Sequence, residues 1–184
     1  GGWCAYRFLI YLDWINSAKA MKMKNYKVAI IGGGVVGVSV LYHLAKLGWT
    51  DCLVVERSIL AAGSSWHAAG GVHALNADPN MAMLQGYTLD LLPKIQRESG
   101  QDIGLHMTGG VTIASAPERW EWLQSAYRTY QTIGIEDVQL LTPSQVKEKC
   151  PLMNVDDVLG GLWADREGYV DTTGTVWAYA KAAK

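Results

Sequence analysis

The sequence predicts an α/β fold, in which a parallel βαβ unit is followed by the beginning of a mixed α+β domain. A β-branched run at residues 27–31 leads through a glycine-rich turn into a helical pattern at 35–47, which Gly48 closes. A second apolar run follows at 52–56, and its consecutive apolar residues are typical of a parallel strand that is covered on both faces. Strand, helix and strand within about thirty residues make one βαβ unit.

The composition is that of a globular chain. Of 184 residues, 49% are hydrophobic and 18% charged, which is enough apolar material for one core and part of another. A formal net charge of -1 argues against a nucleic-acid partner and against binding to an anionic membrane surface. Cys4, Cys52 and Cys150 are scattered and have no metal-ligand spacing, so we expect a reducing compartment and no metal site.

Residues 1–24 form an extension to which we assign no structure. Its apolar stretch at 8–15 is far shorter than the ~20 residues that span a bilayer. The extension has neither the basic region of a signal peptide nor the arginine and serine content of a mitochondrial presequence, and Met21 or Met23 is a candidate start. Because the last helical run stops without a cap, we expect residues 25–184 to be the N-terminal part of a longer domain.

After the βαβ unit, the pattern alternates between helices and strands. A stretch at 58–76 is rich in Gly, Ala and Ser, as in a chain that runs close to a ligand. The further predicted elements are a helix from Pro79, capped by Asp78 and kinked or split at Pro93; strands at 111–114, 138–141 and 159–164; a helix at 117–133; a short helix with a capping box at Thr142 and Gln145; and a last helix capped by Asp171 or Thr172.

The turn after the first strand has the spacing G-x-G-x-x-G. Gly32 allows the tight turn, Gly34 lets the backbone approach a pyrophosphate, and Gly37 lets the helix pack closely on the sheet. The anion would rest on free N–H groups at the positive end of the helix dipole. Glu56 ends the second strand about 20 residues further on, where an acid accepts hydrogen bonds from ribose hydroxyls. This carboxylate argues against a 2′-phosphate and therefore against NADP, although Arg57 beside it weakens that argument slightly.

Five segments carry a resemblance to one protein family. They are VAIIGGGVVGVSVLYHLAKLGW at 28–49, VVER at 54–57, AAGSSWHAAGG at 61–71, GLHMTGGVTIA at 104–114 and EGYVDTTG at 167–174. The chain resembles the FAD-dependent oxidoreductases that include dimethylglycine dehydrogenase and sarcosine dehydrogenase. The fold that this resemblance implies is a Rossmann-like FAD-binding unit with the start of a substrate domain.

The resemblance implies that His67 is bonded covalently to the flavin. A neutral imidazole on a loop of small residues is a competent nucleophile for this bond. Trp66 beside it has two open interpretations, as a shield for the ring system or as a core residue. We name no catalytic residue beyond the attachment point. The positions expected to hold FAD are Gly32, Gly34, Val35, Val36, Gly37, Glu56, Arg57, Gly63, Ser64, Ser65, Trp66, His67, Ala68, Ala69, Gly70 and Gly71.

The activity that the resemblance implies is oxidative demethylation of sarcosine or dimethylglycine. Electrons would leave through an electron-transfer flavoprotein or go to oxygen, and the one-carbon unit would leave as formaldehyde or pass to tetrahydrofolate in a C-terminal domain. The location would be the cytoplasm in a bacterium or the mitochondrial matrix in a eukaryote. Since later segments of such folds complete the sheet and cover the flavin, we expect residues 1–184 alone to bind FAD weakly and to turn over little or nothing.

Two other function classes stay open. One is a non-catalytic regulatory homologue that keeps the nucleotide fold, against which the presence of His67 argues. The other is an NAD-dependent dehydrogenase on the same βαβ unit. Equilibrium binding of FAD against NAD separates these possibilities.

The remaining histidines and the aromatic cluster have simpler interpretations. His43, His73 and His106 have no carboxylate or serine at relay spacing, and we expect no catalytic role for them, although His73 is a candidate lining residue of the flavin pocket. The cluster with helical spacing is expected to pack against the sheet, the alternative being a cage for a methylated ammonium. It consists of Trp120, Trp122, Tyr127 and Tyr130.

Overall fold

The computed structural model describes residues 9–10, 25–76 and 78–184, which form two compact units. The first unit contains the described residues up to Gly70 together with Leu92–Gly104 and Val170–Lys184. The second contains Gly71–Leu91 and Leu105–Tyr169. Each unit is therefore built from segments that are distant in the sequence. The extension at 1–24 lies outside the described residues except for Leu9 and Ile10.

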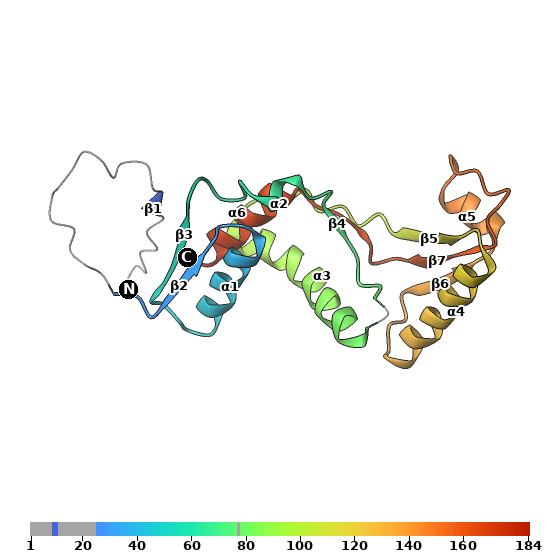
Figure 1. The fold of residues 1–184 in the computed structure, drawn as a ribbon, viewed down its shortest axis with the longest axis horizontal. Helices are drawn as coiled ribbons and strands as arrows, with labels where there is room; N and C mark the ends of the chain where they lie inside the picture. Colours follow the sequence, from blue (N-terminus) through green and yellow to red (C-terminus); the bar gives the residue numbers. More distant parts are fainter. Residues whose placement is uncertain (1–8, 11–24, 77) are drawn as a thin grey trace. The chain divides into compact units, whose positions relative to one another are not determined.

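The first unit has a parallel three-stranded sheet in the order β1-β3-β2, visible in Figure 1. The strands are β1 (Leu9–Ile10), β2 (Val28–Ile31) and β3 (Cys52–Glu56), and helix α1 (Val35–Lys46) connects β2 to β3. Val28 pairs with Cys52 and Ile31 with Val55. This is the predicted βαβ unit, and the predicted α/β fold is confirmed.

Helix α1 packs one face of the sheet and is fixed from two sides. Val38, Leu41 and Tyr42 on α1 are buried, and α1 contacts the last helix, α6 (Thr172–Ala182). The Tyr42 hydroxyl donates a 2.7 Å hydrogen bond to Glu98, and the Tyr42 ring meets Tyr179 edge-on at 5.6 Å between ring centroids. Residues from three distant segments thus build the core of this unit.

The expectation that the second strand is covered on both faces is wrong for the described residues. Ile31 is 91% exposed, and Val55 opposite it on β3 is also exposed, whereas Cys52 and Val54 are buried. Successive side chains of a strand point to opposite faces, and α1 covers one of them. The apolar residues of β3 therefore occupy both faces of the sheet, and no described segment covers the face that carries Val55.

The predicted helix signals hold except at the proline. Gly48 follows α1 with φ +83°, as a left-handed C′ residue. The Asp78 carboxylate accepts the Met81 N–H at 3.0 Å, at the start of α3 (Pro79–Ser99). Helix α3 continues through Pro93, so the predicted split is wrong. Pro93 removes one backbone donor, but buried Leu92 and Ile95 anchor the helix on either side of it.

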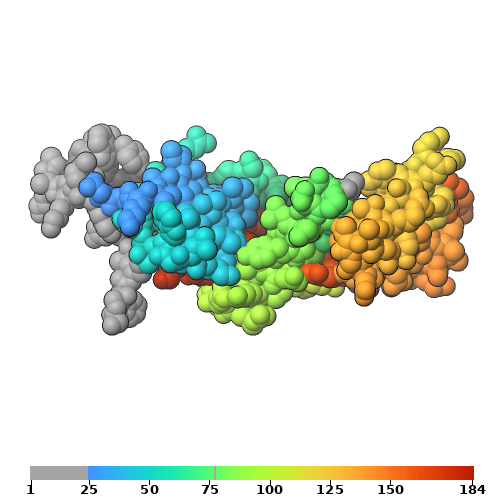
Figure 2. Space-filling model, turned by 90° about the horizontal axis from the view of Figure 1, so that it is seen from below, coloured from blue at the N-terminus to red at the C-terminus, as the bar shows by residue number. Residues whose placement is uncertain are grey.

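The second unit is an antiparallel sheet in the order β5-β7-β6. Strands β5 (Gly110–Ala114), β6 (Val138–Leu141) and β7 (Gly160–Ala164) are joined by α4 (Pro117–Thr132) and by α5 (Pro143–Lys149). Residues 117–149 appear as a yellow-to-orange surface in Figure 2. The capping box of α5 at Thr142 and Gln145 and the Asp171 cap of α6 are as predicted.

The aromatic cluster of α4 divides between core and surface. Tyr130 is 1% exposed in the core beneath α4, with Trp120 and Tyr127 packed against that core. Trp122 is 43% exposed, and the Arg119 guanidinium lies over its ring at 4.3 Å from the centroid. The predicted packing against the sheet is confirmed for three of these residues, whereas Trp122 stays partly exposed at the edge of the packed face.

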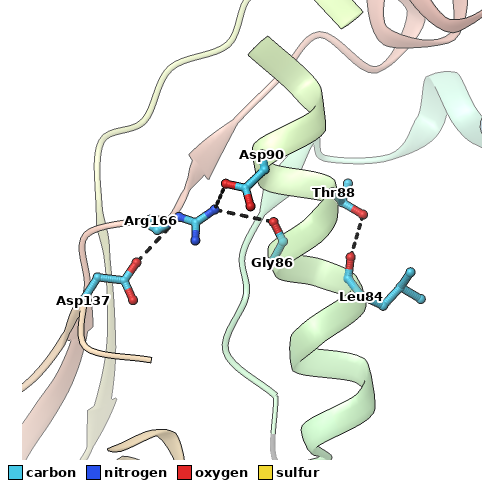
Figure 3. A network of polar contacts seen from close by, with 6 residues as sticks. All are labelled: Leu84, Gly86, Thr88, Asp90, Asp137 and Arg166. Carbon is cyan, nitrogen blue, oxygen red and sulfur yellow. Dashed lines mark hydrogen bonds and ion pairs between the residues drawn. The ribbon is translucent and has the colours of Figure 1, made fainter. Parts of the chain in front are cut away.

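Short elements that the sequence did not predict interrupt the stretch at 58–76 and the region before α6. They are α2 (Ser64–His67), β4 (Gly71–Val72) and β8 (Gly168–Tyr169), with β4 antiparallel to β8. Between β7 and β8, Arg166 binds Asp90 on α3 at 2.6 Å and lies 3.7 Å from Asp137, as Figure 3 shows. Among the described helices, none has the length and apolar character to cross a bilayer.

Candidate functional site

Three glycines shape the turn between β2 and α1. Gly32 has φ +106°, and its N–H donates to the Val55 carbonyl at 2.8 Å, so this residue turns the chain at the end of the sheet. A Cβ at Gly37 would overlap the Gly32 carbonyl oxygen, and one at Gly34 would lie 3.0 Å from the Ser65 hydroxyl. The spacing G-x-G-x-x-G therefore reflects one positive φ and two close approaches.

Gly33, which the predicted set does not include, is a fourth constrained glycine. It is buried, and a Cβ there would lie 2.5 Å from Leu60 Cδ2 and 3.1 Å from Glu56 Cβ. The Gly33 carbonyl accepts the N–H of Ala61, which has an unusual φ of +68° for a non-glycine residue. The run of three glycines is the sequence signal for this residue, because a two-glycine motif leaves the middle position free.

The Glu56 carboxylate holds the turn and the following loop together. It accepts the Gly33 N–H at 2.7 Å on one oxygen and the Ser58 N–H at 3.0 Å on the other. The hydrogen bond from Gly33, followed by that from Ser58, holds the pKa of Glu56 below its ordinary value. An ionised carboxylate has about four acceptor positions, so these two bonds leave capacity for two ribose hydroxyls.

The N-terminus of α1 is accessible and carries the charge that suits an anion. The Val35 N–H donates to the Ser65 hydroxyl at 2.9 Å, and the Val36 side chain is 75% exposed. No atom of the described chain comes within 4 Å of a Cβ built at Gly32. The first N–H groups of a helix have no partner inside it and lie at the positive end of its dipole. The residues present therefore fit a pyrophosphate.

Helix α2 carries the predicted attachment histidine beside this turn. His67 is exposed, and its Nδ1 lies 3.1 Å from the Gly63 carbonyl oxygen. Since a carbonyl only accepts, Nδ1 carries the proton in this contact and Nε2 of the neutral ring keeps its lone pair. Trp66 is exposed too, with its ring centroid 4.0 Å from that of His67. Its interpretation as a core residue is therefore wrong.

The other predicted positions are more loosely tied to the turn. Arg57, Ala68 and Ala69 are exposed. Gly70 has φ +80°, and its carbonyl accepts the Val170 N–H at 2.9 Å just before α6, so the end of the GSSWHAAG segment is fixed. Gly71 begins β4 and belongs to the second unit.

The remaining histidines make contacts within their own units. In the first unit, His43 Nδ1 is 2.7 Å from the Ser39 carbonyl within α1. In the second unit, the backbone of His106 pairs with Tyr169, and their rings stack at 4.9 Å. His73 lines a cavity of the second unit together with Glu167, which sequence spacing does not reveal because the two residues are far apart along the chain.

Comparison with known proteins gives the context of this site. The family described as FAD dependent oxidoreductase matches residues 27–184. Mitochondrial dimethylglycine dehydrogenase of Rattus norvegicus is 35% identical over 159 residues, which is 86% of this chain, and human mitochondrial sarcosine dehydrogenase is 35% identical over 157 residues, or 85%. The structure of glycine oxidase from Bacillus cereus superimposes with a TM-score of 0.72 at 30% identity, covering 86% of this chain and 44% of that one.

The chain spans a small part of these relatives. It covers 18% of the dimethylglycine dehydrogenase and 17% of the sarcosine dehydrogenase. The matched part contains the glycine turn, Glu56 and the segment with His67.

Proposed function

The chain belongs to the FAD-dependent oxidoreductase family, and we propose that the protein oxidatively demethylates a small N-methylated amino acid, sarcosine or dimethylglycine. Residues 25–184 form the N-terminal part of the FAD-binding domain in this proposal, and residues 1–24 remain unassigned. Bound FAD would supply the two-electron oxidation of the N-methyl carbon, after which water would release formaldehyde and the demethylated amine.

The residues of the glycine turn hold the nucleotide half of the cofactor. The free N–H groups of α1 receive the pyrophosphate, and Glu56 accepts the ribose hydroxyls while its bonds to Gly33 and Ser58 keep it ionised. Electrostatics favour this arrangement because the diphosphate meets the helix dipole and the carboxylate meets only hydroxyl donors.

The hydrogen bond from Val35 to Ser65 is the observation that carries the proposal. It joins α1, which would receive the diphosphate, to α2, which carries His67. The groups for the diphosphate and for the flavin of one FAD molecule therefore lie within the same unit. Nδ1 of His67 donates to Gly63, which leaves Nε2 as the nucleophile for the methyl group of the flavin. In this attachment a C–N bond would replace a C–H and an N–H bond, and molecular oxygen would take up the two hydrogens and two electrons as hydrogen peroxide.

The test is the covalent occupancy of the protein after loading with FAD. Peptide mass spectrometry of denatured wild-type protein is expected to find flavin on His67, whereas His67→Ala releases all of its flavin on denaturation. His106→Ala, at an exposed histidine for which no flavin contact is expected, is the matched control and keeps the adduct. FAD-replete protein without any adduct overturns the attachment, and protein that prefers NAD over FAD in equilibrium binding overturns the flavoenzyme proposal itself.

The route of electrons and carbon belongs to the same proposal. An electron-transfer flavoprotein or oxygen takes the electrons, and tetrahydrofolate bound elsewhere in the protein is a candidate acceptor for the one-carbon unit. A regulatory protein on this fold needs no attachment group, so covalent flavin also argues against that alternative. Mitochondrial and bacterial relatives exist, and on that basis we propose a matrix location in a eukaryote or a cytoplasmic location in a bacterium.

A further inference from the structure

The second unit contains a cavity whose lining shares no residue with the set of positions proposed to hold FAD. Its volume is about 270 Å³, and all of its lining residues belong to this unit. Charged and aromatic side chains line it together with leucines: His73, Arg119, Trp122, Tyr130 and Glu167. A cavity just below the ~300 Å³ at which pockets for drug-sized ligands begin suits a smaller molecule.

Gly109 and Gly110, at the start of β5, hold Glu167 in this cavity. The Gly109 N–H donates to the Glu167 carbonyl at 2.9 Å, and a Cβ at Gly110 would occupy the place of the Glu167 carboxylate. Burial raises the pKa of Glu167, and nearby His73 acts in the opposite direction. Within the described part of the chain the carboxylate has no hydrogen-bond donor, so a cation that enters the cavity relieves its desolvation.

Cationic and aromatic groups form another part of the lining. The Arg119 guanidinium stacks over Trp122, which leaves the edge of its planar donor fork free, and no carboxylate pairs with it among the described residues. Tyr130 and Trp122 contribute ring surface, which favours an alkylated ammonium over a small hydrated ion. The lining thus offers a partner for each of two opposite charges.

We propose that this cavity binds a small zwitterionic amino acid, with its ammonium group on Glu167 and its carboxylate on Arg119. A simple anion would meet the Glu167 carboxylate, and a simple cation would meet Arg119 and His73, so neither satisfies both ends. The inference goes beyond the proposed oxidation because it requires no flavin. It also gives a role to Glu167 and Gly110, which are distant in sequence and meet at the cavity.

Isothermal titration calorimetry of the 184-residue chain with sarcosine tests this binding. We expect saturable binding of sarcosine, and binding at least about tenfold weaker for acetate and for methylammonium, each of which keeps one charge. Glu167→Gln and Arg119→Gln should each weaken sarcosine binding about tenfold or more. Glu121→Gln and Arg128→Gln remove the same charges from exposed positions of α4 outside the lining and should leave binding unchanged.

Several outcomes overturn the proposal. Wild-type protein that gives no saturable heat with sarcosine contradicts it, as does equal binding of acetate, methylammonium and sarcosine. Sarcosine binding that survives both lining variants puts the ligand elsewhere. Circular dichroism establishes that the variants are folded. FAD titration of the wild-type protein separates the two proposals, because absent FAD binding together with saturable sarcosine binding contradicts only the first, whereas FAD binding without sarcosine binding contradicts only the second.

Discussion

The hydroxyl of Ser65 accepts a hydrogen bond from the backbone N–H of Val35 at 2.9 Å, which ties the start of α2 to the first turn of α1. The two residues come from different parts of the chain, and Gly34 leaves the room for their approach. Because a serine oxygen satisfies one of the orphan donors of α1 in the way that a helix cap does, the contact stabilises the fold and positions His67 at once.

Ser65→Ala is therefore expected to lower the free energy of unfolding by about 1 kcal/mol, the usual cost of losing a serine cap. It should also slow covalent flavin attachment to His67, because α2 loses its link to the nucleotide turn. Ser64→Ala is the control, since Ser64 is exposed on the same short helix. Urea unfolding and the rate of adduct formation are the measurements. Equal behaviour of the two variants would show that the contact has no positioning role.

Two glycine-to-alanine substitutions should change the free energy of unfolding in opposite directions. Gly37→Ala places a Cβ on the Gly32 carbonyl, and because backbone cannot move aside cheaply we expect a loss of about 1–3 kcal/mol in unfolding free energy. Gly86→Ala, inside α3 with nothing within 4 Å of its Cβ, should stabilise by about 0.5–1 kcal/mol. Thermal denaturation measures both, and a stabilising Gly37→Ala contradicts the close packing of the turn.

The sequence predicted the elements whose causes are local. The capping box at Thr142, the Asp171 cap and the left-handed Gly48 all follow from neighbouring residues, and each lies where the pattern indicates. The short helix α2 was not predicted, because four residues are too few to show a helical periodicity. It is stabilised instead by the hydrogen bond between Ser65 and Val35. A contact across the chain of this kind leaves no signal in a local pattern.

The residues of the candidate site also divide into those that a local pattern predicts and those that depend on contacts across the chain. Gly32, Gly34 and Gly37 follow from their spacing, whereas the constraint on Gly33 depends on Leu60 and Glu56 in space. The presence of His73 and Glu167 in one cavity lining was missed for the same reason. Pro93 shows the reverse case for the predicted split, since α3 is continuous through this local helix breaker and buried residues on either side anchor it.

Arg166 should contribute little to stability despite its two acidic partners. The ion pair with Asp90 is short, but the Arg166 side chain is 42% exposed and that of Asp90 74%, so water screens it (Figure 3). Arg166→Gln is expected to cost below about 1 kcal/mol, and less when salt rises to about 0.5 M. Lys94→Gln, which breaks the exposed pair with Glu98 at 3.8 Å, is the comparison and should cost less still. A loss of several kcal/mol on Arg166→Gln would contradict this ranking.

The ionisation of Glu56 makes the stability of the fold depend on pH in the acidic range. The hydrogen bonds from Gly33 and then Ser58 hold the pKa of Glu56 in the folded chain below its value in the unfolded chain, about 4.3. The stabilisation is therefore complete above that unfolded pKa and is lost as the pH falls through the lower folded pKa. Glu56→Gln leaves one of the two N–H groups without a good acceptor and should cost about 1 kcal/mol at pH 7.

The comparison of wild-type protein with Glu56→Gln across pH separates this cause from general acid denaturation. The difference in unfolding free energy between the two proteins should be constant from pH 7 to about pH 5 and should shrink below about pH 4, where the wild-type carboxylate takes up a proton and loses one acceptor. Glu136→Gln, at an exposed position in the second unit, is expected to show no such change. A difference that grows as the pH falls would mean that the folded chain raises the pKa of Glu56, which would refute its role as a charged acceptor for Gly33 and Ser58.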